Sequence, residues 1–164
     1  RYNVAEGEQG HVALLEQEFA VSVEASFCLT VASGGYALAT ALRALNVQPG
    51  DRVLTNAFTL APVPGSIASV GAIPVYVGVT EDLVIDLEDL QAKIAQADVL
   101  MLSHMRGHIC DMDHLMKICE QAGVRVIEDC AHTMGCQVQT SVELGFGRSH
   151  WSMDTAQVLV RVMI

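Results

Sequence analysis

The stretch from Val124 to Gly135, VRVIEDCAHTMG, places two acidic residues directly after an apolar run. The apolar run predicts a buried strand, with Glu128 and Asp129 at its carboxyl end. In an open α/β sheet, ligands bind at the carboxyl ends of strands, so these carboxylates are expected where chemistry takes place. Asp129 could also simply cap the next turn, as aspartates at strand ends often do.

The turn Ser33-Gly34-Gly35 is a second candidate site, because it joins a predicted strand to a predicted helix. Its backbone N–H groups and the positive end of the helix dipole can bind a phosphate, and glycine permits a close approach. Glycine pairs here are also common as tight turns without a ligand, so both interpretations stay open. The further spaced glycine of the dinucleotide fingerprint is missing, which disfavours a nicotinamide cofactor.

Three histidines, a cysteine and two aspartates gather in the segment SHMRGHICDMDH, residues 103–114. Zinc prefers such ligands. One hypothesis is therefore a metal-dependent hydrolase that uses three of these side chains, His104, His108 and His114. The spacing does not match the common zinc fingers, so we favour no metal. We expect instead that Asp111 or Asp113 caps the following helix beside a crevice at a strand end.

An early phosphate cradle, a carboxylate at a later strand end and His132 three residues after it together indicate a phosphorylated aromatic cofactor. Pyridoxal 5'-phosphate fits this description. It acts as an electron sink while its ring nitrogen stays protonated, and a buried carboxylate opposite that nitrogen keeps the proton in place. Asp129 has the chemistry and the position for this role.

Alternating strands and helices are expected to position these side chains. The predicted strands are Phe27 to Val31, Arg52 to Thr55, Ile73 to Val77, Val99 to Leu102 and the apolar run before Glu128. Helical spacing or start and stop residues predict helices at Val12 to Phe19, Tyr36 to Leu45, near Pro62, after Asp86 and before Gly123. This alternation implies a doubly wound α/β fold, a mostly parallel sheet with helices on both faces.

The composition excludes several classes of protein. The 164 residues, 51% of them hydrophobic, suit one domain or part of a larger one. A net charge of -10 leaves no basic stripe for nucleic acid. Five unevenly spaced cysteines are typical of free thiols in a reducing compartment. Without a bilayer-length apolar run or a signal peptide, we expect a cytoplasmic protein that does not bind membranes.

Five runs resemble, in order and spacing, the sugar aminotransferase family named DegT/DnrJ/EryC1/StrS. They are VASGGYALATALRAL, PGDRVLTNAFTLAPVPGSI, VGAIPVYVGV, LSHMRGHICDMD and VIEDCAHTMG. The resemblance implies that residues 1–137 are part of the large domain of a pyridoxal phosphate enzyme of fold type I. In its complete form such an enzyme would act on a nucleotide-linked keto-sugar with an amino acid as nitrogen donor. The family's active site forms between two subunits, so a homodimer is expected.

The resemblance also implies roles for particular residues. Gly34, Gly35 and Tyr36 stand where the family's turn donates backbone N–H groups to the cofactor phosphate. Asp129 stands where an aspartate pairs with the pyridine nitrogen, and His132 where a Gln or His contacts the cofactor ring and its hydroxyl.

One position departs from the family pattern. Leu60 stands where the family usually has an aromatic residue stacked on the cofactor. Phe58 would lie on the same face if this segment were extended, so it is a candidate substitute.

The family's Schiff-base lysine lies downstream of VIEDCAHTMG, with a phosphate-binding serine just before it. This chain has only Lys93 and Lys117, both upstream and in predicted helices. Transamination needs an amine that holds the cofactor and shuttles a proton, so we expect the chain as written to be inactive.

The tail, residues 138–164, shows no family resemblance and no clear periodicity before the apolar run Val158 to Ile164. We hypothesise a truncation or a shifted reading frame, with a genuine short paralogue as the alternative. The alternative function is a non-catalytic cofactor-binding or interaction protein. The sugar and the pathway, polysaccharide or secondary metabolite biosynthesis, stay open.

Overall fold

A computed structural model of the chain describes residues 10–23, 25–133, 136 and 159–162. The chain divides into two compact units, residues 1–32 with 137–150 and residues 33–136 with 151–164. In the described ranges, no helix is long and apolar enough to cross a membrane.

The first unit contains helix α1, His11–Ser22, which confirms the predicted N-terminal helix. The predicted strand from Phe27 to Val31 is wrong, because residues 27–32 form a loop. Phe27 is 88% exposed. A strand needs a neighbour for its N–H and C=O groups, whereas here the Glu16 carboxylate accepts from the Thr30 N–H and hydroxyl at 2.8 and 2.9 Å. These two bonds also hold the pKa of Glu16 below its ordinary value.

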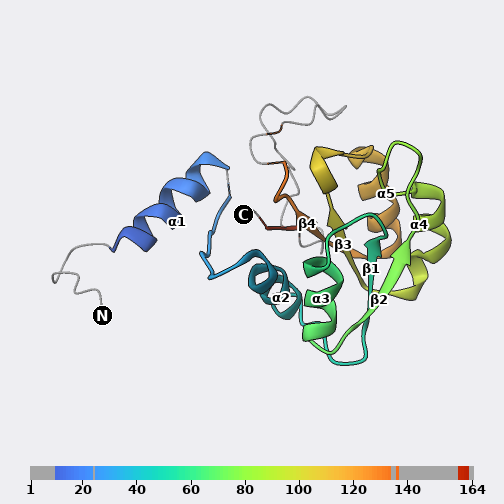
Figure 1. The fold of residues 1–164 in the computed structure, drawn as a ribbon, viewed down its shortest axis with the longest axis horizontal. Helices are drawn as coiled ribbons and strands as arrows, with labels where there is room; N and C mark the ends of the chain where they lie inside the picture. The colour runs from blue at the N-terminus through green and yellow to red at the C-terminus, as the bar shows by residue number, and fades with distance from the viewer. Residues whose placement is uncertain (1–9, 24, 134–135, 137–158, 163–164) are drawn as a thin grey trace. The chain divides into compact units, whose positions relative to one another are not determined.

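The second unit is built on a five-stranded parallel sheet in the order β2-β1-β3-β4-β5 (Figure 1). The strands are β1 Arg52–Asn56, β2 Ile73–Val77, β3 Val99–Ser103, β4 Arg125–Asp129 and β5 Leu159–Val162. The four strands predicted before Glu128 in this unit are confirmed. Strand β5 comes from the apolar run in the tail and pairs with β4. The rest of the tail, residues 138–158 and 163–164, lies outside the described residues.

In the described part of this unit, four α-helices and two short 3₁₀ turns precede or connect the strands. They are α2 Gly34–Ala44, α3 Pro62–Ser69, α4 Leu87–Lys93, η1 Ile94–Gln96, η2 Met105–Gly107 and α5 Met112–Ala122. Asp86 caps α4, and of the two candidates for α5 it is Asp111 that accepts from the His114 N–H, at 3.0 Å. Gly123 ends α5 with a left-handed φ of 71°, a conformation that glycine adopts without strain.

Alternate strand residues pack into two separate cores. Val53, Met101 and Ile127 face α2 and α3, whereas Leu54, Leu100 and Val126 belong to the core on the α4 and α5 side. Figure 1 shows these two helix pairs on opposite sides of the strands. A doubly wound sheet with helices on both faces is therefore confirmed.

The strand order reverses at β1. Val53 pairs with Pro74 of β2 on one side and with Val99 of β3 on the other. The connection to β2 runs through α3 on one face, and the connection to β3 runs through α4 on the opposite face. Such a reversal leaves a crevice at the carboxyl ends of the two central strands.

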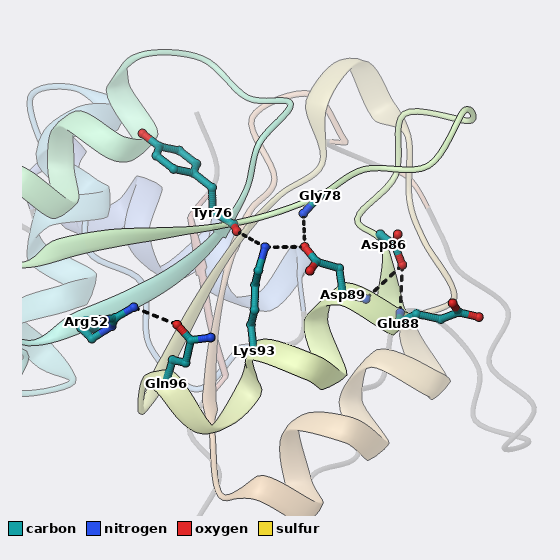
Figure 2. A network of polar contacts seen from close by, with 8 residues as sticks. All are labelled: Arg52, Tyr76, Gly78, Asp86, Glu88, Asp89, Lys93 and Gln96. Atoms are coloured by element: carbon teal, nitrogen blue, oxygen red, sulfur yellow. Dashed lines mark hydrogen bonds and ion pairs between the residues drawn. The ribbon is translucent and has the colours of Figure 1, made fainter.

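A polar network fixes α4 to the end of β2 (Figure 2). Asp89 Oδ2 accepts from the Gly78 N–H at 2.6 Å and from Lys93 Nζ at 2.7 Å. Lys93 also donates to the Tyr76 carbonyl at 2.8 Å. The Gly78 bond, then Lys93, holds the pKa of Asp89 below its ordinary value.

We expect Asp89→Asn to lower the free energy of unfolding by about 1 kcal/mol at neutral pH, because the pair is partly exposed to solvent. A carboxylate with a depressed pKa stabilises the fold above its unfolded pKa of about 3.9, and this contribution disappears as the pH falls through the folded value. Urea unfolding of wild type and variant should therefore converge at low pH. Glu88→Gln, on the same helix, is the matched control. An equal difference at neutral and acidic pH would contradict the assignment.

Candidate functional site

A pocket of about 200 Å³ lies where the ends of β3 and β4 meet the starts of α2 and α3. Five of the six residues predicted for the site line it, Gly34, Gly35, Leu60, Asp129 and His132. Tyr36 is not among the lining residues. The carboxyl edge of the sheet therefore brings together side chains that are about a hundred residues apart in the sequence.

The start of α2 forms the amide-rich end of the pocket. Ser33 caps the helix, and its Oγ accepts from the Tyr36 N–H at 3.3 Å. Tyr36 thus already has a partner, while the amides of Gly34 and Gly35 belong to the first helical turn, which has no partners within the helix. A Cβ added to Gly35 would meet nothing within 4 Å, so the space beside it is open. This end of the pocket has the character of an anion site.

Asp129 lies at the end of β4 with 9% of its surface exposed. Its Oδ1 accepts from the Ala131 N–H at 3.2 Å, and its Oδ2 accepts from the Ser103 hydroxyl at 3.3 Å. The first bond confirms the turn-capping interpretation, and the same carboxyl group lines the pocket. One aspartate therefore closes its own turn and places a negative charge at the pocket.

A buried asparagine that the sequence did not single out holds Ser103 in place. Asn56, at the end of β1, accepts from the Ser103 N–H at 2.9 Å and donates to the Ser103 carbonyl at 3.0 Å. Its side-chain amide also donates to the Phe58 carbonyl at 2.9 Å. The side chain of Asn56 thus continues the pairing of β1 with β3 beyond the last backbone bonds. An asparagine directly after a buried strand was the available signal.

His132 is exposed, and its ring Nδ1 accepts from the Arg106 backbone N–H at 2.9 Å. Arg106 has a left-handed φ of 54° within the turn η2, which is uncommon for residues other than glycine. The His132 ring and the turn η2 are therefore joined by a hydrogen bond from a backbone N–H, which no sequence motif indicated.

Leu60 lines the pocket and is 50% exposed. The premise for Phe58 as an aromatic substitute is wrong, because residues 57–59 form a bend and Phe58 does not line the pocket. The physical reason is the bond from Asn56 to the Phe58 carbonyl, which turns the chain immediately after β1.

The three histidines proposed as metal ligands do not form a cluster in the described part of the chain. Only His104 joins a group with ligand atoms within 4.8 Å of one another, and its partners there are Glu128 and Cys130. All three side chains are buried, and none is without a partner in the protein. His114 is exposed on α5. The arrangement is a buried polar cluster of His104, Glu128 and Cys130 rather than the hypothesised histidine trio, and His104 also lines the pocket.

None of the lysines and none of the buried cysteines places a nucleophile in the pocket. Lys93 is bound to Asp89 and Tyr76, and Lys117 is exposed on α5. All five cysteines are free, and burial raises the pKa of Cys110 and Cys119 to about 12. Those two thiols stay protonated near neutral pH and are unreactive.

This fold and this pocket define the class of the protein. The parallel doubly wound sheet is the fold of the solved aminotransferases of pyridoxal phosphate fold type I that it resembles. The aminotransferase from Psychrobacter cryohalolentis superimposes with a TM-score of 0.71 at 31% identity, over 76% of this chain and 32% of that one.

Residues 5–149 match the DegT/DnrJ/EryC1/StrS aminotransferase family, and the chain belongs to that family. It is 33% identical to GDP-perosamine synthase of Vibrio cholerae over 130 residues, 78% of this chain and 35% of that protein. It is 34% identical to UDP-N-acetyl-3-dehydro-alpha-D-glucosamine 3-aminotransferase of Acidithiobacillus ferrooxidans over 143 residues, 86% of this chain and 38% of that protein. The chain thus spans little more than a third of these curated relatives.

We expect Asn56→Ala to lower the free energy of unfolding by about 3 kcal/mol, because it leaves the buried N–H and C=O of Ser103 without partners. Asn46→Gly is the matched control, since Asn46 is exposed with a φ of 59° and glycine tolerates that conformation. Urea unfolding measures both variants. A loss for Asn56→Ala no larger than that of the control would show that the Asn56 clamp does not hold β1 and β3 together.

Proposed function

We propose that this chain forms the cofactor-binding part of a sugar aminotransferase large domain, with pyridoxal phosphate in the pocket at the carboxyl edge of the sheet. The observation that carries the proposal is the convergence of Gly34, Gly35, Asp129 and His132 on one pocket. Their donor set suits that cofactor, because amides match a phosphate, a carboxylate matches a protonated ring nitrogen and an imidazole matches a ring oxygen.

Each residue would act through the geometry it already has. The amides at the start of α2 would hold the phosphate, aided by the helix dipole. Asp129, fixed by Ser103 and Ala131, would keep a proton on the ring nitrogen. Leu60 and Val63 would shield the ring from water with apolar surface. When bound, the cofactor supplies an electron sink that stabilises negative charge on the substrate carbon.

The substrate of the complete enzyme would be a keto-sugar carried on a nucleotide, with an amino acid as nitrogen donor. Support comes from the two curated relatives, one named for a GDP-sugar and the other for a UDP-sugar. We also propose a homodimer, as the family resemblance implies. Helix α1 buries no side chain in the first unit, so its apolar surface is available for a partner.

A second candidate function is a pocket that binds the cofactor without transamination. The observation that favours it is the position of Lys93 and Lys117, neither of which lines the pocket. Binding and covalent attachment can be measured separately, and the two experiments below do so.

Pyridoxal phosphate added to the purified chain should bind reversibly, and Asp129→Asn should weaken binding by about tenfold, because one charge-assisted contact to the ring nitrogen is lost. Absorbance titration with dialysis measures the affinity. Asp82→Asn, an exposed aspartate in the turn after β2, is the control of the same chemistry. Equal affinity for all three proteins would rule out Asp129 as the partner of the ring.

Borohydride reduction of the mixture should leave no stoichiometric lysine adduct that depends on the pocket. We expect only low, equal labelling of Lys93 and Lys117 in wild type and in Asp129→Asn, because both lysines lie away from the pocket. Peptide mass spectrometry quantifies the labelling. One fully labelled lysine in wild type that loses its label in Asp129→Asn would contradict the second candidate function.

A further inference from the structure

The turn η2, Met105–Gly107, lies against the residues that follow β4. It is held by the Gly107 N–H, which donates to the His104 carbonyl at 3.1 Å, and by the His104 N–H, which donates to the Asp129 carbonyl at 3.2 Å. A Cβ built on Gly107 would lie 3.5 Å from the His132 carbonyl oxygen, so this end of the turn lies close to the His132 backbone. The turn is therefore fixed relative to the pocket.

The Arg106 N–H points at the ring of His132 and donates to its Nδ1 at 2.9 Å. A nitrogen that accepts a hydrogen bond carries no proton, so neutral His132 must carry its proton on Nε2. The other tautomer would set two N–H groups against each other. The guanidinium group takes no part in this bond, which depends only on the left-handed backbone at Arg106.

We propose that η2 is a positioning element, in which the Arg106 backbone N–H locks His132 as the Nε2–H tautomer and so makes it a hydrogen-bond donor to the pocket. The group that His132 meets must then be an acceptor, an oxygen with negative charge or lone pairs. This inference deepens the proposed function and rests on it for the identity of that oxygen, an oxygen of pyridoxal phosphate. The tautomer itself does not depend on any ligand.

The test reads the tautomer directly in the ligand-free chain. Long-range ¹H–¹⁵N correlation at about pH 8, where imidazoles are neutral, separates protonated from unprotonated ring nitrogens. The spectrum of His132→Gln identifies the His132 signals among those of the six histidines. His114, exposed on α5, is the internal reference for a free mixture of tautomers. We expect a single Nε2–H form for His132, and an Nδ1–H form or a mixture like that of His114 would overturn the proposal.

Two substitutions at Arg106 separate the backbone from the side chain. Arg106→Asn keeps the N–H and suits a positive φ, so the His132 tautomer should not change. Arg106→Val disfavours that φ, so His132 should lose its single-tautomer pattern. An unchanged tautomer in a folded Arg106→Val protein, or a changed one in Arg106→Asn, would overturn the role of the turn. If Arg106→Val does not fold, the tautomers of His132 in wild type and in Arg106→Asn still test the proposal.

Cofactor affinity supplies a separate readout. If pyridoxal phosphate binds wild type, Arg106→Val should weaken its binding by about tenfold, the effect expected for one misplaced hydrogen-bond donor. Arg106→Asn should leave the affinity unchanged. Equal affinities in all three proteins would overturn the link between turn and ligand. A wild-type chain with the locked tautomer and no affinity for the cofactor would refute the proposed function and leave the tautomer assignment standing.

Discussion

The pairing of β1 with β3 is the constraint on which the site depends. The strand order reverses at β1, so the connections on either side of it lead to opposite faces of the sheet. Backbone pairing places Thr55 in register with Met101. Beyond this pair, the Asn56 side chain continues the pairing with two hydrogen bonds to the Ser103 backbone. Because Ser103 in turn donates to Asp129, the Asn56 side chain at the end of β1 helps to position the pocket carboxylate through Ser103.

The alternation of side chains along β4 sorts two adjacent acids into different roles. Ile127 packs in the core beside α2 and α3, and Asp129, two residues on, lines the pocket on that face. Glu128 points to the other face and is buried with His104 and Cys130. The sequence pattern predicted that Glu128 and Asp129 both lie at the ligand-binding end of the strand. Successive side chains of a strand point to opposite faces, however, so only one of the two can face the pocket. The same alternation on β3 puts Ser103 beside Asp129, with which it is in register.

Local patterns were sufficient for strands β1 to β4 and helices α2 to α5, because apolar runs and capping residues such as Asp86 act within a few positions. They failed from Phe27 to Val31, since β-forming residues make a strand only where a neighbouring strand can pair with them. They also failed at Phe58, where a side chain from the preceding strand bends the chain. Asn56 and Arg106 act through partners far away in sequence, 47 and 26 residues respectively, so no local pattern could reveal what they bind.

The polar groups of the pocket are positioned largely by backbone atoms. Ser33 caps α2 through the Tyr36 N–H, Ala131 supplies an N–H to Asp129, and Arg106 supplies one to His132. Backbone donors are fixed by the fold and cost little side-chain entropy, so such a pocket is preorganised before any ligand arrives. None of these bonds involves a lysine. Under the proposed function, recognition of the cofactor would rest on these fixed backbone donors, so it can be measured separately from covalent attachment.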